Sequence, residues 1–255
     1  MKLTIGMASF NNREEVKKTI KCLRMYHDLS DSEILVVDNF GDDILRDWIS
    51  YWGSGAVRYE RFTEIQGTAA PRQKVFELAK GEFVICIDSH ITLFPGSLDK
   101  LWDGPDLIHG PMAYDDLRGF CTRFENVWRD SMWGIWGPTI PRDLIPKEPF
   151  DIWGHGLGLF GCRKDSWLGF NPGFRQFGGE EGYIHEKYRK AGRRVICLPW
   201  MIWNHDFRDG PAPYQSSMIH RVRNYILGHE ELKMDTSPIL NHFGINLFNA
   251  ARRLS

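Results

Sequence analysis

Two side chains that commonly bind metal ions follow a run of apolar residues in the first half of the chain. The run from Phe83 to Ile87 ends in Asp88-Ser89-His90 and predicts a strand that is buried on both faces. Because alternate residues of a strand point to the same side, Asp88 and His90 can bind one ion together. A carboxylate with an imidazole suits Mn²⁺ or a similar divalent ion better than Ca²⁺. A strand that simply ends in polar residues would look the same, so metal binding is a hypothesis at this point.

Two adjacent carboxylates form a second group of candidate catalytic residues. Glu180 and Glu181 follow a glycine pair and open a predicted helix, whose dipole favours the ionised carboxylate. The glycines would leave room for a ligand against the backbone, and a carboxylate there can hold substrate hydroxyls or accept a proton. An acidic helix start without such a role is also common. His205 follows a later predicted strand; lone histidines are usually structural or solvated, but as a third ligand beside Asp88 and His90 it would leave positions open for a substrate diphosphate.

Other polar residues could bind a nucleotide, although each also has a structural explanation. Asp38 ends a predicted strand and can either hydrogen-bond a base or ribose or form a turn. Arg72 and Lys74 lie near the start of a predicted helix, where they could meet a diphosphate or remain solvated surface charges. The first turn, from Ala8 to Asn12, lacks Gly-x-Gly-x-x-Gly and the Walker Gly-Lys-Ser/Thr. This argues against a dinucleotide-dependent oxidoreductase and a P-loop NTPase.

Composition narrows the class of protein further. The 255 residues are 42% hydrophobic, and the net charge of -1 offers no electrostatic basis for binding nucleic acid or an anionic membrane. The five cysteines are widely spaced and contain no Cys-x-x-Cys pair, which is typical of a reducing compartment. The first residues pass directly into a predicted strand, and no apolar stretch is long enough to cross a bilayer. We therefore expect a cytoplasmic protein with no membrane span.

The elements that must position these groups alternate between strand and helix over residues 3–90. Strands are predicted at 3–9, 33–37, 56–59 and 83–88, and helices after Asn12, at 42–51 and at 68–80. Such alternation predicts the α/β class, with a parallel sheet covered by helices on both faces. Ligands bind at the carboxyl ends of the strands in sheets of this kind, which is where Asp38 and Asp88 are placed.

The alternation of predicted strands and helices stops in the middle of the chain. Residues 104–153 are rich in glycine and proline, predict a long irregular segment, and hold Trp128, Trp133, Trp136 and Trp153. The segment could cover a sheet edge, or its aromatic rings could form a wall of a substrate cleft suited to sugar rings. Order is predicted to return with a glycine-spaced strand at 156–162, a helix at 180–191 and a strand at 194–198. Residues 214–255 are expected to be mostly helical.

Together these features resemble the GT-A glycosyltransferases, and most closely the group containing polypeptide N-acetylgalactosaminyltransferases and galactosyltransferase-like enzymes. The resemblance runs from residue 3 to residue 210. Four motifs carry it: Asp88-x-His90, Gly156 to Phe160, Phe177-Gly178-Gly179-Glu180-Glu181, and His205 with Phe207 and Arg208.

The resemblance implies a GT-A type, Rossmann-like α/β fold with a mostly parallel sheet. Residues 1–210 would form one domain, with a nucleotide-binding half at 1–103 and an acceptor half at 104–210, followed by a helical C-terminal extension at 211–255. A nucleotide-diphosphate sugar would be the donor, with a UDP-sugar favoured, and Asp88, His90 and His205 would hold Mn²⁺ or Mg²⁺. The residues implied in nucleotide-sugar binding are Ala8, Ser9, Asn11, Asp38, Arg72, Asp88, Ser89, Gly158, Gly179 and Arg208.

Departures from the family pattern leave parts of the chemistry open. Phe177 stands where the family usually has tryptophan, and Glu181 stands where retaining members tend to have asparagine and inverting members an aspartate base. Glu180 is expected to orient donor sugar or acceptor, and Glu181 to be the base if the enzyme inverts. The acceptor could be a protein side chain, a glycan or a hydroxylated nucleobase, although near-neutral charge weighs against DNA. A sugar nucleotidyltransferase and a catalytically inactive nucleotide-sugar-binding protein are the alternatives.

Overall fold

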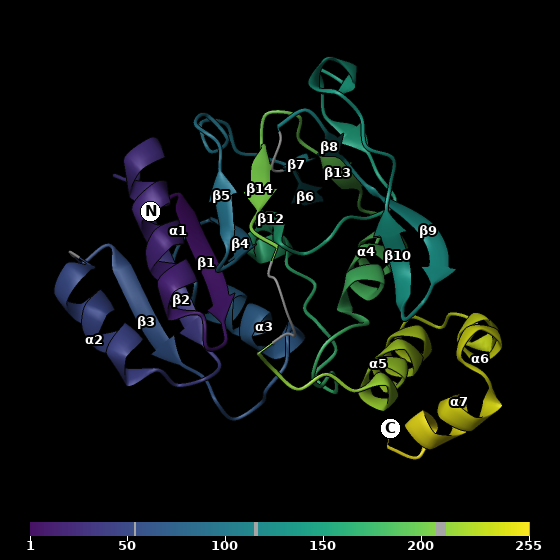
Figure 1. The fold of residues 1–255 in the computed structure, drawn as a ribbon. Helices are drawn as coiled ribbons and strands as arrows, with labels where there is room; N and C mark the ends of the chain where they lie inside the picture. The colour runs from purple at the N-terminus through teal and green to yellow at the C-terminus, as the bar shows by residue number, and fades with distance from the viewer. Residues whose placement is uncertain (54, 115–116, 208–212, 255) are drawn as a thin grey trace.

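An eight-stranded sheet forms the centre of the computed structural model, which describes residues 1–53, 55–114, 117–207 and 213–254. The strand order is β11 (Phe150–Asp151), β13 (Val195–Cys197), β6 (Leu107–His109), β12 (Leu159–Arg163), β4 (Phe83–Asp88), β1 (Leu3–Ser9), β2 (Ser32–Asp38) and β3 (Val57–Arg61). The four strands β1 to β4 are parallel, whereas β12 runs antiparallel to both β4 and β6 (Figure 1). The predicted α/β class and mostly parallel sheet are therefore confirmed.

Helices cover both faces of this sheet, as the apolar runs of its strands require. The helices α1 (Arg13–Tyr26) and α2 (Asp43–Trp52) pack on one face through residues such as Ile20 and Leu45. The helices α3 (Ala69–Leu78) and α4 (Glu180–Lys190) pack on the other through residues such as Val75 and Ile184. No helix in the described residues is both long enough and apolar enough to span a membrane. All five cysteines are free, and the cytoplasmic location stays a prediction.

The segment 104–153 is more regular than its composition predicts. It contains β6, β7 (Met112–Ala113), β8 (Phe120–Cys121), β9 (Phe124–Arg129), β10 (Met132–Trp136), β11 and a short 3₁₀ turn. Strands β7 and β8 join β5 (Ile91–Leu93) and β14 (Trp203–His205) in a second sheet of order β5-β14-β7-β8, and β9 pairs with β10 as a hairpin. The expectation of an irregular segment was therefore wrong; β6, β7, β8 and β11 have only two or three residues each, too few to show hydrophobic alternation in the sequence.

Three helices end the chain: α5 (Met218–Glu231), α6 (Ser237–Phe243) and α7 (Ile245–Arg252). They lie beside the β9–β10 hairpin (Figure 1). Trp128, Trp133 and Trp153 pack with these helices in a separate apolar cluster that includes Tyr225 and Phe248. These three rings therefore hold the C-terminal helices in place, and they do not form the wall of a cleft.

Candidate active site

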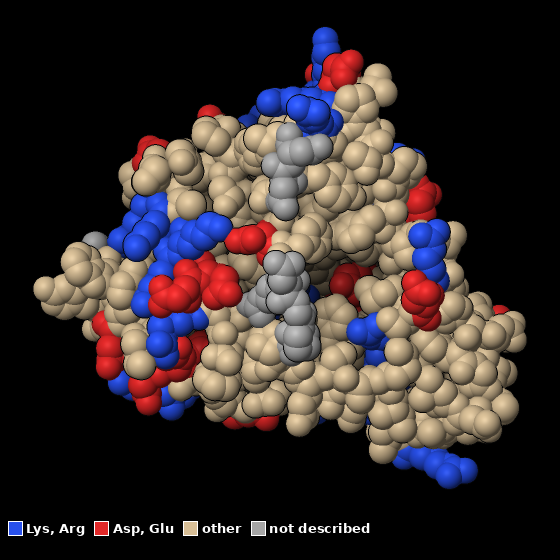
Figure 2. Space-filling view, viewed as in Figure 1, with Lys and Arg blue, Asp and Glu red and all other residues tan. Residues whose placement is uncertain are grey.

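A cavity of about 330 Å³ opens at the carboxyl ends of β1 and β4. Its lining comes from the first turn, from the ends of β4 and β14, from β10, and from the start of α4. The two sheets and α4 are brought together here although they are far apart in sequence. In the space-filling view, the molecular face is hollowed near its centre and an acidic side chain shows inside the hollow (Figure 2).

The structure brings the three predicted metal ligands together at this cavity. Ligand atoms of Asp88, His90 and His205 all lie within 4.8 Å of one another, and His205 Nε2 is 4.0 Å from Asp88 Oδ2. Antiparallel pairing of β14 with β5 sets His205 opposite Ile91, and Asp206 N donates to His90 O at 3.0 Å. A contact between distant segments thus carries His205 to the end of β4, where Asp88 and His90 already lie.

A buried arginine connects Asp88 to Glu180. Arg72 is 6% exposed, and its guanidinium donates to Asp88 Oδ1 at 2.8 Å and to Glu180 Oε1 at 3.3 Å. Burial tends to raise the pKa of Asp88, but Arg72 and the neighbouring histidines outweigh it, so the pKa lies below its usual range. The pKa of Arg72 is raised, because its two carboxylate partners outweigh the effect of burial. Asp88 is therefore ionised at neutral pH and available to a cation.

The two adjacent glutamates point in different directions, as neighbouring residues of a helix must. Glu180 is 1% exposed, accepts hydrogen bonds from Thr68 Oγ1 and Arg72, and is not part of the cavity lining. Glu181 does line the cavity. Burial and the charge of Glu180 raise the pKa of Glu181 to about 8. Direct contact of Glu180 with substrate stays a prediction, and Glu181 is the carboxylate that faces the cavity.

The glycine pair before α4 makes room for a helix and not for a ligand. Gly178 and Gly179 have φ values of 97° and 98°, which side chains rarely adopt. A Cβ on Gly179 would lie 2.8 Å from Asn224 Cβ, and one on Gly178 would lie 2.6 Å from Arg221 Nε. The expectation of ligand space against this backbone was wrong, because α5 fills it. Gly179 itself does not line the cavity.

A buried pair of histidines fastens α4 to the sheet. His109 Nδ1 is 3.0 Å from Leu159 O, so it donates there and leaves Nε2 as an acceptor. His185, one turn after Glu181, places its Nε2 at 2.9 Å from His109 Nε2 and donates to it. Burial lowers the pKa of both imidazoles well below the usual value, so both are neutral. This link sets the helix that carries Glu181 at a fixed position against β6.

The first turn lines one side of the cavity, and its role in nucleotide binding stays a prediction. Ala8 and Ser9 line it, but Asn11 is exposed with a φ of 53°, and Asn12 takes its place in the lining. Asn12 Nδ2 donates to Ser89 Oγ at 2.8 Å, and Ser89 is buried behind the cavity. Within the described part of the chain, Ser9 Oγ and Asn12 Oδ1 are buried without a hydrogen-bond partner. These atoms are suited to bind a polar ligand.

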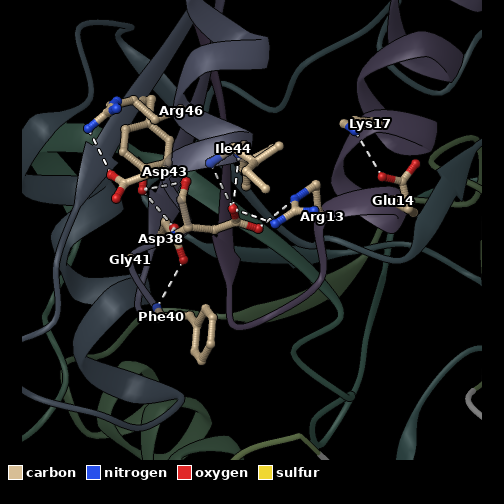
Figure 3. Close-up of polar contacts among 12 residues, drawn as sticks. Arg13, Glu14, Lys17, Asp38, Phe40, Gly41, Asp43, Ile44 and Arg46 are labelled. Carbon is tan, nitrogen blue, oxygen red and sulfur yellow. Dashed lines mark hydrogen bonds and ion pairs between the residues drawn. The ribbon is translucent and has the colours of Figure 1, made fainter.

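Asp38 closes the turn that leads into α2. Its Oδ1 accepts from Phe40 N at 2.9 Å, and its Oδ2 accepts from Asp42 N at 2.6 Å and from Tyr59 OH at 2.7 Å (Figure 3). With an exposure of 1% it does not line the cavity, whereas the next residue, Asn39, does. The turn alternative is therefore the one this geometry supports, and contact of Asp38 with a nucleotide stays a prediction.

Three aromatic rings at the cavity were not among the predicted site residues. Tyr214 packs edge-on to Phe10 at 6.2 Å between ring centroids and stacks on Phe177 at 5.8 Å. Burial raises the pKa of Tyr214 to about 12, so its hydroxyl stays protonated. Position 177 carries a large ring in the family motif, but nothing local distinguishes Tyr214. Arg208, predicted to bind the nucleotide, lies outside the described residues.

Gly158 and one tryptophan complete the predicted lining. A Cβ on Gly158 would lie 2.7 Å from the ring of Trp203 and 3.4 Å from His205, so the glycine is required for this close approach. Of the four tryptophans in segment 104–153, Trp136 lines the cavity, next to Phe124 and Met132 of the same hairpin. The aromatic wall expected from the sequence is thus limited to one tryptophan of the four.

Comparison with known proteins agrees with this geometry. The family model described as glycosyl transferase family 2 matches residues 4–158. Polypeptide N-acetylgalactosaminyltransferase 10 of Homo sapiens is 28% identical over 199 residues, covering 69% of this chain and 32% of its own, and the Mus musculus protein matches equally. The chain spans about a third of the length of these curated relatives.

Solved structures show the same fold. A crystal structure of GalNAc-T7 with UDP, GalNAc and Mn²⁺ superimposes with a TM-score of 0.73 at 19% identity, covering 91% of this chain and 49% of that one. S. aureus TarS 1–349 with UDP-GlcNAc gives 0.59 at 16% identity, covering 100% of this chain and 70% of that one. The mannosyltransferase PcManGT from Pyrobaculum calidifontis, with GDP-Man and Mn²⁺, gives 0.57 at 15% identity, covering 99% and 73%. The chain has the GT-A fold and belongs to glycosyl transferase family 2.

Proposed function

We propose that the protein transfers a sugar from a nucleotide-diphosphate sugar to an acceptor hydroxyl with the help of a divalent metal ion. The observation that carries this proposal is the convergence of Asp88, His90 and His205, with ligand atoms within 4.8 Å, at the cavity that Glu181 also lines. A UDP-sugar is the favoured donor, because two of the structural neighbours are described with UDP or UDP-GlcNAc. The GDP-Man complex of PcManGT makes a guanosine donor the alternative.

The ligand set fits Mn²⁺, with Mg²⁺ as the alternative. One carboxylate and two imidazoles are the donors that borderline divalent ions accept, and Mg²⁺ prefers an all-oxygen set. His90 Nδ1 is buried without a hydrogen-bond partner in the described structure, so this imidazole has a nitrogen to spare for an ion or an ordered water. When bound, the ion would neutralise charge on the departing diphosphate. Two described neighbours contain Mn²⁺, which supports this choice.

The chain's own residues would divide the remaining work. Arg72 holds Asp88 in place from behind, and Glu180 holds Arg72. Ser9 and Asn12 offer unpaired polar atoms to the nucleotide. Glu181 would accept the proton of the acceptor hydroxyl if the reaction inverts, because its carboxylate faces the cavity and its raised pKa makes it a stronger base. NMR of the product anomer distinguishes inversion from retention.

A screen of nucleotide sugars with Mn²⁺ tests the proposal. We expect slow release of nucleoside diphosphate from one donor, abolished by a chelator. His90→Ala should weaken Mn²⁺ binding by about 10–100-fold in calorimetric titration. His242→Ala, at a half-buried histidine on α6 outside the cavity lining, is the matched control and should leave binding unchanged. Release of pyrophosphate would instead identify a nucleotidyltransferase, and equal Mn²⁺ affinity of His90→Ala and wild type would contradict the metal site.

A further inference from the structure

One side of the cavity presents an apolar surface that we call the acceptor shelf, formed by Phe124, Met132 and Trp136 of the β9–β10 hairpin. The rings of Phe124 and Trp136 meet edge to face with centroids 4.7 Å apart. The hairpin and β1 lie well apart in the fold (Figure 1), and both contribute residues to the cavity lining. An incoming acceptor would therefore meet these side chains, while the donor occupies the other side.

The hairpin is built so that the shelf faces the cavity. Met132 and Trp136 both line the cavity from β10, and Gly134 lies between them with a φ of 88°. The Trp133 side chain packs away from the cavity, in the apolar cluster with the C-terminal helices, and its backbone N–H donates to Tyr225 OH at 3.0 Å. A Cβ on Gly156 would lie 2.9 Å from the Trp136 ring, so the indole lies directly against the backbone there. The shelf is thus held by packing on both sides.

The apolar character of the acceptor shelf disfavours an anionic acceptor. Glu181 is the one charged side chain among the described lining residues on the α4 and hairpin side. Arg221, which lies behind it, stacks its guanidinium 4.9 Å over the Phe177 ring and donates to Ser131. A phosphorylated acceptor or a nucleic acid would lay its charge on the three apolar side chains of the shelf, none of which offers it a cationic partner.

Polarity argues against a peptide in the same way. An extended peptide brings a backbone N–H and C=O at every residue, and each needs a partner when it leaves water. The three shelf side chains offer no hydrogen-bonding group apart from the indole N–H of Trp136. A pyranose ring has an apolar C–H face that can lie on an aromatic side chain, while its hydroxyls stay at the rim and can reach Glu181.

We propose that the acceptor is a neutral glycan whose terminal pyranose ring lies on the acceptor shelf. This inference rests on the proposed function and specifies its acceptor. In the transfer, the acceptor oxygen forms a bond to the anomeric carbon of the donor. The bond from that carbon to the diphosphate oxygen breaks, and its electron pair leaves with the nucleoside diphosphate. The hydroxyl proton passes to Glu181 or to solvent.

An acceptor panel with the full chain, Mn²⁺ and the donor found in the screen tests this inference. The probes are neutral methyl and p-nitrophenyl hexosides, a Ser/Thr peptide and an oligonucleotide with hydroxymethylated bases, each followed by transfer of radiolabelled sugar. We expect a neutral hexoside to be labelled and to accelerate diphosphate release. Labelling of the peptide or the oligonucleotide with no hexoside labelled would overturn the inference.

Variants at the shelf give a second readout. Trp136→Ala should raise the acceptor KM about tenfold, equivalent to about 1.4 kcal/mol, and should raise the donor KM far less. Trp136→Phe should restore most of the acceptor affinity, because it keeps an aromatic face. Trp52→Ala is the matched control, since Trp52 is 57% exposed at the end of α2. An unchanged acceptor KM in Trp136→Ala would refute the proposal that the acceptor binds on the shelf.

The outcomes separate this inference from the proposed function. Donor hydrolysis without labelling of any hexoside would remove the glycan acceptor and leave the glycosyltransferase activity standing. Absence of hydrolysis and transfer with every nucleotide sugar would remove the proposed function and this inference together.

Discussion

Replacement of Arg72 by alanine tests whether the buried charges of the site are held by this one cation. The variant leaves Glu180, which is 1% exposed, without its charged partner and removes the 2.8 Å contact to Asp88. Breaking a buried ion pair from one side costs about 3–5 kcal/mol, because a desolvated charge remains unpaired. For a chain of this size each kcal/mol lowers the melting temperature by about 2–4 °C. We therefore expect a decrease of about 6–20 °C.

The stabilisation that Arg72 gives to the fold should depend on pH in a direction set by Asp88. Burial raises the pKa of Asp88, but Arg72 helps to lower it, and the net pKa is below the usual value. The pair therefore stabilises the fold fully at pH values above the usual carboxyl pKa range. This stabilisation is lost as the pH falls through the lowered pKa of Asp88 in the folded protein. The difference in stability between wild type and Arg72→Ala should therefore be largest at neutral pH and should narrow below about pH 4.

Urea denaturation followed by tryptophan fluorescence, at several pH values, measures these differences. Arg46→Ala is the matched control, because Arg46 forms exposed ion pairs with Asp43 (Figure 3) and with Asp47, both at 2.8 Å, and should contribute little to stability. Arg72→Met should also lose stability, because it leaves the Glu180 carboxylate unpaired. The double variant with Glu180→Gln should recover part of that loss, since the unpaired charge of Glu180 is then removed. A loss below about 1 kcal/mol in Arg72→Ala, or one equal to that of Arg46→Ala, would refute the reasoning.

Three further variants address the remaining features of the site. Glu181→Gln should lower turnover by about 10²–10⁴-fold with donor affinity nearly unchanged; near-normal turnover would remove Glu181 as the base. In the wild type, burial raises the pKa of Glu181 to about 8, so turnover should rise with pH and reach half its maximum near that value; a flat pH–rate profile from 6 to 9 would contradict this. Gly179→Ala should destabilise the fold by about 1–3 kcal/mol in urea, since its Cβ would lie 2.8 Å from Asn224 Cβ. Gly192→Ala is the control, because this glycine has a φ of 71° and no atom within 4 Å of the added Cβ, so the variant has the backbone strain without the contact. A loss of stability in Gly192→Ala equal to that in Gly179→Ala would show that the contact with α5 is irrelevant.

Local sequence patterns were sufficient to predict the parallel part of the sheet. The strands β1, β2 and β4 are mostly apolar and almost fully buried, because helices cover both of their faces. Asp88 and His90 could be paired from spacing alone, since they follow one strand. His205 was a candidate from its residue type, but only the family resemblance linked it to this pair, because the pairing of β14 with β5 brings it there. That pairing joins segments more than a hundred residues apart and leaves no local pattern.

Other assignments failed where a distant element decides the role of a residue. The glycine pair Gly178–Gly179 has the composition of a ligand loop, and only the presence of α5 shows what the missing side chains make room for. Trp133 and Trp136 are three residues apart, yet one packs on the C-terminal helices and the other lines the cavity. The sequence around Asp38 does not distinguish a nucleotide-binding aspartate from one that closes a turn, and the hydrogen bond that Tyr59 OH donates to it favours the turn.

The position of β12 in the sheet affects how the chain can be synthesised without aggregating. Strand β4 is apolar from Phe83 to Ile87, and its outer edge is covered by β12, which begins at Leu159. During synthesis on the ribosome, β1 to β4 are complete well before β12 is made, so the backbone N–H and C=O groups on one edge of β4 have no partner strand during that time. Apolar, uncharged edges of this kind recruit other strands and seed aggregates. The first half of this chain, expressed alone, should therefore precipitate or bind chaperones until the second half supplies β12.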